Sequence, residues 1–303
     1  MNTRILTHTD RPALEALLLR ESAHNVFHLS ALAETGLEAP EQHGGSWAVG
    51  AFKGAELVGA LAVLRGTGGI YHTPGDTETL ESLACAVEAH GNKGMLSLVS
   101  GHSTQIDPLL RLVRGIDTRI IDRCRFYILQ PDEMIMPPVD GQYVPRIATE
   151  DDIERLIDFY SVGFYSLARL PSRAAWRNRL AEQIAFRTLF LVEDSSKIVS
   201  AALSSAEAGG CAMLGGVATL HSHRARGIST LCVGKLCRHL FEQKPQKIEK
   251  ICLFYLKENK SAGRVYDKLG FKPAGQWLLA PVGLGASFAP FMLSGEWRSK
   301  PET

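Results

Sequence analysis

Two stretches of this chain resemble each other when its second half is laid over the first at an offset of 142 residues. Arg4–Asp10 then lies over Arg146–Asp152, and in both segments a short apolar run leads into Thr, polar residues and Asp. This composition is typical of a helix N-cap, and the apolar residues that follow it recur at helical spacing. We therefore expect each half to begin with a strand, a cap and an amphipathic helix.

The same register brings two further patterns together, residues 47–64 and residues 189–203. Each consists of two apolar runs joined by a polar or Gly-containing turn, which predicts a β-hairpin. Because both matches share one register, they indicate two copies of one unit. A break rich in Pro and Gly, Met136–Gly141, separates the copies. We predict two domains, residues 1–138 and residues 143–303.

Length and composition agree with this division. The chain has 303 residues, 45% of them hydrophobic, so each half is long enough to bury its own core. Its apolar runs are shorter than the ~18–20 residues that span a bilayer, and the N-terminal segment reaches Asp10 and Arg11 too soon for a signal peptide. The six cysteines form no C-x-x-C pair, which favours buried, free thiols in a reducing compartment: Cys85, Cys124, Cys211, Cys232, Cys237 and Cys252. We expect a cytoplasmic protein without a membrane segment.

The net charge of +1 hides an uneven distribution. Residues 1–140 hold 11 Lys and Arg against 17 Asp and Glu, a balance of −6, whereas the rest of the chain holds 22 against 15, a balance of +7. Residues 223–272 alone hold 12 Lys and Arg against 4 Asp and Glu. This basic segment favours a polyanionic ligand in the second half.

A strand, a basic loop and a helix follow one another at the start of this segment. The apolar run Cys211–Thr219 predicts a buried strand, and its paired Gly215 and Gly216 indicate a bulge or the close approach of a ligand. The loop His221–Gly227 is basic, and after it apolar residues recur at helical spacing from residue 228 to residue 241. The free N–H groups and the dipole at the start of such a helix attract anions, and nearby Arg side chains strengthen the attraction.

A second strand and helix follow. Residues 248–256 predict the strand, Asn259 is a favoured N-cap residue, and Gly270 is placed for a left-handed C-terminal stop. The apolar residues of this helix share one face: Ala262, Val265, Tyr266 and Leu269.

These two elements carry a family resemblance. Arg224–Ser229 resembles the R/Q-x-x-G-x-G/A acetyl-coenzyme A (acetyl-CoA) loop of the GNAT superfamily of N-acetyltransferases, with Ser229 where the pattern has Gly or Ala. Asn259–Phe271 is similar to the N-x-x-A-x-x-x-Y-x-x-x-G-F element of the same family. The resemblance covers about residues 146–275. The segments Gly216–Thr219 and Asn259–Ala262 are most similar to the glycine N-acyltransferase-like branch. It implies an α+β fold of tandem GNAT-like domains, each a mostly antiparallel twisted sheet flanked by helices.

The resemblance also implies roles for individual residues. The Val217 N–H would polarise the thioester carbonyl, and Tyr266 would give its proton to the departing thiolate, so these are the candidate catalytic groups. The implied cofactor-binding set is Val217, Ala218, Thr219, Arg224, Ala225, Arg226, Gly227, Ile228, Ser229, Thr230, Asn259, Ala262 and Tyr266. The amine would attack directly in a ternary complex, without a metal and without a covalent enzyme intermediate.

The expected activity is therefore acetyl-CoA-dependent N-acetylation of a primary amine on a small molecule, by a monomer or homodimer. A longer acyl group, or an amino-acid acceptor as in the glycine N-acyltransferase-like branch, remains open. So does a regulatory module that binds acyl-CoA without catalysis. A nucleic-acid partner is not expected, because no aromatic-rich platform or reading helix accompanies the basic segment.

Several other residues need an interpretation. Glu207 is the nearest carboxylate that could act as a base, although a plain surface Glu fits better, and His221 and His223 lack the neighbouring ligands of a metal site. We expect the remaining histidines and the helix aromatics to be mostly packing residues, some of the aromatics lining an acceptor pocket: His24, His28, His102, Phe159, Tyr160, Phe164, Tyr165 and Trp176. The first copy has the acidic Ile70–Glu78 in place of the basic loop, so we expect it to keep the fold without the cofactor and to serve structure or acceptor binding.

Overall fold

The computed structural model describes residues 1–37, 46–64, 67–72, 76–91, 98–112, 121–138, 141–163 and 172–281, which fall into two compact units. Unit 1 begins at Met1 and unit 2 begins at Tyr127. The chain passes from unit 1 into unit 2 within β6 (Asp122–Leu129). It returns to unit 1 at Gly275, within β12 (Lys272–Pro281).

Unit 1 is a mostly antiparallel sheet with helices packed on it. Its strands lie in the order β1-β2-β3-β4-β5, and only the pair β4 and β5 is parallel among those described in these five strands. The elements are β1 (Asn2–Ile5), η1 (His8–Asp10), α1 (Arg11–Leu19), α2 (Ser22–Thr35), β2 (Ser46–Lys53), β3 (Glu56–Leu64), β4 (Thr67–His72), α3 (Thr77–Gly91), β5 (Leu98–His102) and α4 (Ser103–Leu112). The returning chain adds β12 beside β5, with Trp277 opposite His102.

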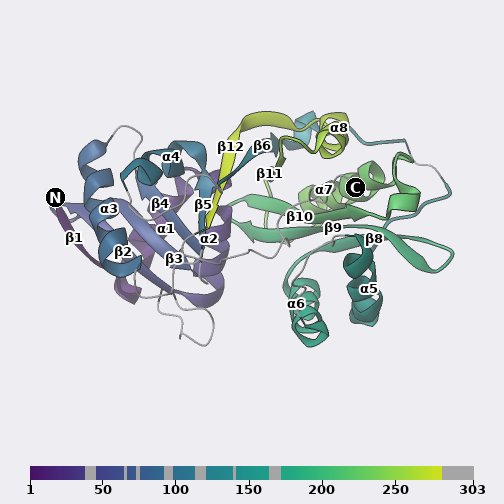
Figure 1. The fold of residues 1–303 in the computed structure, drawn as a ribbon, viewed down its shortest axis with the longest axis horizontal. Helices are drawn as coiled ribbons and strands as arrows, with labels where there is room; N and C mark the ends of the chain where they lie inside the picture. The colour runs from purple at the N-terminus through teal and green to yellow at the C-terminus, as the bar shows by residue number, and fades with distance from the viewer. Residues whose placement is uncertain are drawn as a thin grey trace, which may run out of the picture. The chain divides into compact units, whose positions relative to one another are not determined.

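Unit 2 repeats the same element order. Its elements are η4 (Pro131–Glu133), β7 (Arg146–Ile147), η5 (Glu150–Asp152), α5 (Ile153–Gly163), α6 (Arg173–Phe186), β8 (Leu189–Asp194), β9 (Lys197–Ala208), β10 (Cys211–Thr219), η6 (His221–His223), α7 (Ile228–Glu242), β11 (Lys250–Leu256) and α8 (Lys260–Lys268). The strands lie in the order β7-β8-β9-β10-β11-β6, and again the pair before the last helix, β10 and β11, is parallel. Figure 1 shows α5 and α6 on one face of this sheet and α7 on the other.

The repeat extends to single side chains. The Arg4 guanidinium donates two hydrogen bonds to the Asp10 carboxylate, of 2.8 and 2.7 Å, and Arg146 does the same to Asp152, at 2.6 and 2.7 Å. Each aspartate also accepts from the backbone N–H of the N-cap Thr, at 2.9 Å in unit 1 and 3.0 Å in unit 2. The predicted tandem α+β fold, with two copies of one mostly antiparallel sheet flanked by helices, is confirmed.

The two units do not follow the predicted domains, residues 1–138 and 143–303. The first stretch of unit 1 ends at Phe126, and the chain belongs to unit 1 again from Gly275. The physical reason is the pairing of β12: residues 277–281 run antiparallel to residues 98–102 and so belong to the sheet of unit 1. Nothing in the composition of this strand indicates which sheet it will join.

The core of unit 2 is built on the predicted apolar faces. The buried residues of α7 pack against β8, β9 and β10, at the spacing that predicts this helix: Ile228, Leu231, Cys232, Leu236, Cys237 and Leu240. Burial raises the pKa of the Cys232 thiol to about 12, so this cysteine behaves as a small apolar residue.

All six cysteines are free, and five are buried as predicted, whereas Cys85 is exposed. Across the described residues, the structure contains no helix with the length and hydropathy needed to cross a membrane.

Candidate active site

The strand β10 opens away from its parallel neighbour. It pairs with β11 over Cys211–Met213, although both strands continue beyond this stretch. Its register against β9 shifts between Gly215 and Ala218, and Gly216 has φ +57°, which is the bulge that the paired glycines predict. A Cβ atom at Gly216 would lie 2.7 Å from a methyl group of Leu203, so the close packing also requires glycine.

Side chains from α5 and β9 hold this open stretch. The buried Tyr160 hydroxyl donates to the Gly216 carbonyl at 3.0 Å. The Ser200 hydroxyl donates to the Ala218 carbonyl at 2.9 Å and lies 2.9 Å from the Thr219 hydroxyl. The backbone from Gly216 to Thr219 is therefore held in place while it stands apart from β11.

The helix α7 begins without a side-chain cap. Its N-cap is Gly227 with φ +78°, and Ala225 also has a left-handed φ of +61°. The first backbone bond into the helix runs from the Leu231 N–H to the Gly227 carbonyl, at 3.0 Å. The N–H groups of residues 228–230 thus have no acceptor within the helix, and they carry the positive end of its dipole.

The helix α8 is capped at both ends. The Asn259 side chain accepts from the Ala262 N–H at 3.0 Å and from the Ser261 hydroxyl at 2.8 Å, which confirms the predicted N-cap. At the other end the Phe271 N–H donates to the Tyr266 carbonyl at 3.1 Å, and Gly270 has the predicted left-handed conformation, φ +94°. These caps fix the turn of α8 that carries Tyr266.

Tyr266 itself is only 2% exposed. Its ring contacts those of Tyr255 and Phe271, with centroid distances of 5.5 and 5.7 Å and interplanar angles of 50° and 64°. A side chain packed in this way is restricted in orientation, which suits a group that must present its hydroxyl to a reacting atom.

These elements meet at one pocket of about 370 Å³. Twelve of the 13 residues that the sequence places in the cofactor site line it: Val217, Ala218, Thr219, Arg224, Ala225, Gly227, Ile228, Ser229, Thr230, Asn259, Ala262 and Tyr266. The thirteenth, Arg226, is not in the lining, and its guanidinium lies 3.5 Å from the Tyr143 hydroxyl. The side chains of Arg224 and Arg226 therefore diverge, although they are two residues apart.

Five further residues line the pocket that the sequence analysis did not place in the cofactor site: His223, Ser261, Arg264, Val265 and Lys268. Four of them follow the helical spacing i, i+3, i+4, i+7 on α8, so the spacing already indicated one common face. Of the described residues in the lining, none is an Asp or a Glu, whereas Arg224, Arg264 and Lys268 are cations. The pocket is suited to a ligand with several negative charges.

The comparisons with known proteins agree with this geometry. Residues 148–271 match the model of the Acetyltransferase (GNAT) family. This GNAT domain includes every residue of the pocket lining. No curated protein matches the chain.

Solved structures of GNAT proteins share the fold over nearly the whole chain. A GCN5-related N-acetyltransferase from Sphaerobacter thermophilus has a TM-score of 0.63 at 16% identity, covering 92% of this chain and 94% of that one. An acetyltransferase of the GNAT family from Colwellia psychrerythraea has a TM-score of 0.57 at 14% identity, covering 93% and 100%. A tandem GNAT protein from the clavulanic acid biosynthesis pathway has a TM-score of 0.58 at 13% identity, covering 93% and 98%. At such identities the likeness concerns the fold.

Other predicted positions of the GNAT domain lie away from the pocket. Glu207 is not in the lining; it forms an ion pair with Lys244 at 2.8 Å and accepts a hydrogen bond from Ser204. His221 is exposed, and the described residues include no group of three or more His, Cys, Asp or Glu side chains arranged to hold a metal. Phe159, Tyr160 and Trp176 are buried in the core. Phe164 and Tyr165 lie outside the described residues.

The histidines of unit 1 take part in packing. His28 and His102 are buried, and the rings of His24 and His102 stack at 3.9 Å between centroids.

Unit 1 differs from the GNAT domain at the start of the corresponding helix. There the Asp76 carboxylate caps α3, accepting from the Thr79 N–H at 3.0 Å and from the Thr79 hydroxyl at 2.7 Å. An aspartate at this point satisfies the helix dipole from within the chain and repels phosphate. In addition, the seventh residue of α4 is Leu109, where the seventh residue of α8 is Tyr266.

Proposed function

We propose that unit 2 transfers an acetyl group from acetyl-CoA to the primary amine of a small molecule. One observation carries the proposal: a pocket whose described lining contains no carboxylate brings together the open stretch of β10, the uncapped start of α7 and the buried Tyr266. Proteins of the GNAT family use acetyl-CoA as co-substrate, and its pyrophosphate, 3′-phosphate and extended pantetheine arm need such a combination of groups.

The residues present fit this co-substrate. The N–H groups of residues 228–230 and the Arg224 guanidinium would bind the pyrophosphate, because a helix start and a forked cation are the groups that proteins use for phosphate oxygens. Arg264 and Lys268, which share the pocket face of α8, would bind the remaining phosphate. The backbone groups of Val217–Thr219, separated from β11, would pair with the amides of the pantetheine arm.

The chain's own residues then account for the reaction. Bound acetyl-CoA supplies an activated acyl group, its thioester. The Val217 N–H would donate to the carbonyl oxygen where negative charge develops, and Tyr266 would hold a proton at its hydroxyl for the departing sulfur. No cysteine is among the described lining residues, which favours direct attack by the amine in a ternary complex.

Unit 1 has a different role in this proposal. Asp76 occupies the helix start that would receive phosphate, and leucine replaces the tyrosine on α4. Unit 1 is thus a degenerate copy that does not bind the cofactor and serves structure or acceptor binding.

Titration calorimetry and thermal shift with coenzyme A and acetyl-CoA test the cofactor. We expect both to bind the wild type, and Arg224→Glu to abolish binding, because the substitution puts a carboxylate into an anion site. The control is Arg238→Glu, which changes an exposed ion pair with Glu242 elsewhere on α7 and keeps the affinity. If neither compound binds the wild type, the proposal is wrong.

A thiol-release assay with a panel of amines tests catalysis. Release with a polyamine or an aminoglycoside, reduced at least tenfold by Tyr266→Phe, supports the proposal. Release with amino acids and longer acyl-CoA substrates indicates the glycine N-acyltransferase-like alternative. Binding of acyl-CoA without thiol release, and without an effect of Tyr266→Phe, indicates a regulatory module instead.

A further inference from the structure

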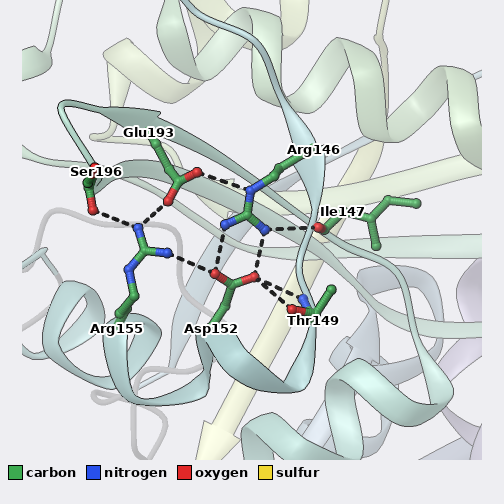
Figure 2. Close-up of polar contacts among 7 residues, drawn as sticks. All are labelled: Arg146, Ile147, Thr149, Asp152, Arg155, Glu193 and Ser196. Carbon is green, nitrogen blue, oxygen red and sulfur yellow. Dashed lines mark hydrogen bonds and ion pairs between the residues drawn. The ribbon is translucent and has the colours of Figure 1, made fainter.

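An ion network joins β7, η5 and α5 of unit 2 to the strand β8. Figure 2 shows Arg146 between two carboxylates, those of Asp152 and Glu193, with Arg155 bridging the same two. The Arg146 Nε atom lies 3.0 Å from Glu193, and the Arg155 Nη1 atom lies 3.0 Å from Asp152. Hydrogen bonds from the two arginines lower the pKa of Glu193, so it is ionised at neutral pH.

The first copy of the repeat lacks half of this network. At the offset of 142 residues Arg4, Asp10 and Ala13 correspond to Arg146, Asp152 and Arg155. The strand pairing places Phe52 where unit 2 has Glu193, and the Arg4 guanidinium lies over the Phe52 ring, 4.4 Å from its centroid. The shared pair is sufficient to cap the first helix in unit 1. Capping therefore does not account for the second Arg–Glu pair, which occurs in the unit that has the pocket.

The second pair holds the turn of the hairpin. The Arg155 Nη2 atom donates to the Ser196 carbonyl at 2.7 Å (Figure 2). Ser195 and Ser196 form this turn, and both have a left-handed φ, of +50° and +66°. Such a turn costs conformational energy in residues other than Gly, and the arginine contact stabilises it.

Hydrogen bonds also connect this turn to the pocket. Asp194 directly precedes it and accepts a hydrogen bond from the Ser195 hydroxyl at 3.1 Å. Its other oxygen lies 3.1 Å from Nε2 of His223, which lines the pocket next to Arg224. The Nδ1 atom of His223 lies 2.9 Å from the Ser222 hydroxyl, so both ring nitrogens are engaged within the loop and the hairpin. The imidazole thus joins β8 to the segment that leads into α7.

We propose that Asp194 and His223 are positioning residues that fix the loop before α7 for phosphate binding, with Arg155 holding the turn that carries Asp194. This inference rests on the proposed function of the pocket. Arg224 and the N–H groups of α7 follow His223 within seven residues. An anion site made of backbone N–H groups binds tightly when the backbone is already in place, since ordering a loop on binding consumes part of the interaction energy.

Calorimetry with coenzyme A on three proteins tests the effect on affinity. We expect Asp194→Ala to raise the Kd about tenfold, and Asp194→Asn to stay within about threefold of the wild type, because the amide oxygen still accepts from Nε2–H. The matched control is Asp158→Ala, which removes an exposed ion pair with Arg173 and leaves the Kd unchanged. With an accepted amine, Asp194→Ala should raise the KM for acetyl-CoA and leave kcat unchanged.

Hydrogen exchange of the free proteins provides a measurement that needs no ligand. Asp194→Ala should speed amide exchange in residues 220–227, whereas Asp158→Ala should not. Unchanged exchange in Asp194→Ala, an unchanged Kd, or an equal loss of affinity in Asp194→Asn would overturn the positioning role. If exchange rises but the wild type binds no coenzyme A, the positioning of the loop stands and the proposed function fails.

Discussion

Replacing Asp152 should lower the free energy of unfolding of unit 2 by an amount that follows from the structure. Its side chain is 3% exposed, and hydrogen bonds from Arg146 and from the Thr149 N–H lower its pKa from 3.8 to about 2. A difference of that size corresponds to about 2 kcal/mol of stability at pH 7. The Asp152 side chain is shielded from solvent, but its partner Arg146 is 39% exposed, so this value is an upper bound that solvent screening lowers.

The sign of the pH dependence follows from the direction of the shift. The carboxyl has a lower pKa in the folded than in the unfolded protein, so its contribution is fully present above the unfolded value, near 4. It is lost as the pH falls towards 2, and at pH 3 roughly half remains. Asp152→Asn cannot titrate, so the free-energy difference from the wild type should shrink in the same window.

Urea unfolding at pH 7, 5, 4 and 3 measures this difference. We expect Asp152→Asn to be less stable than the wild type at pH 7, with the pH-dependent part of the gap amounting to at most about 2 kcal/mol. Asp158→Asn is the control, because its ion pair with Arg173 is exposed and contributes little. A gap that is equal at pH 7 and pH 3 would refute the assignment of this stability to the Asp152 charge.

Three further outcomes are expected. Gly270→Ala should destabilise unit 2 by more than about 2 kcal/mol in urea unfolding, since a Cβ there would lie 2.0 Å from the Glu133 carbonyl oxygen at φ +94°; Gly54→Ala, at φ +63° with open space, should cost about 1 kcal/mol. Tyr160→Phe should cost about 1–2 kcal/mol by leaving the Gly216 carbonyl without its donor, and an unchanged midpoint would contradict that role. The double variant Arg264→Ala/Lys268→Ala should bind dephospho-coenzyme A like the wild type but lose the preference for coenzyme A in calorimetry; a retained preference would remove these residues from phosphate binding.

Local patterns predicted the parts of the site that local forces build. The strand Cys211–Thr219 with its glycine bulge, the Asn259 cap and the Gly270 stop each depend on a few neighbouring residues, and each has the conformation that its sequence predicts. The repeat was visible for the same reason, because a cap needs its Thr and Asp at fixed spacing. The face of α8 that carries Arg264 and Lys268 follows from helical spacing too, but both residues fall at positions where the family motif specifies no residue type.

Contacts between distant segments were beyond the reach of such patterns. The Asp194 and His223 side chains are 29 residues apart, and only the fold of β8, β9 and β10 brings them together. The pairing of β12 with β5 joins residues about 180 positions apart, and any strand with an apolar face would satisfy the same edge. The direction of Arg226, towards Tyr143, likewise depends on the β7 side of unit 2 and not on the loop motif.

The site accounts for only a small part of the charge difference between the two halves. Of the 12 Lys and Arg residues between positions 223 and 272, three line the pocket, so most of the basic excess lies elsewhere in unit 2. What distinguishes the copies more sharply is the first turn of one helix: Asp76 fills it in unit 1, whereas Gly227 leaves it open in unit 2. A carboxylate at a helix start has the same preference for the dipole as a phosphate does, and a covalently tethered carboxylate is always present. The N-cap residue is therefore one physical difference between the two copies: in unit 1 a carboxylate accepts from the first turn of the helix, whereas in unit 2 glycine leaves the first backbone N–H groups without a side-chain acceptor.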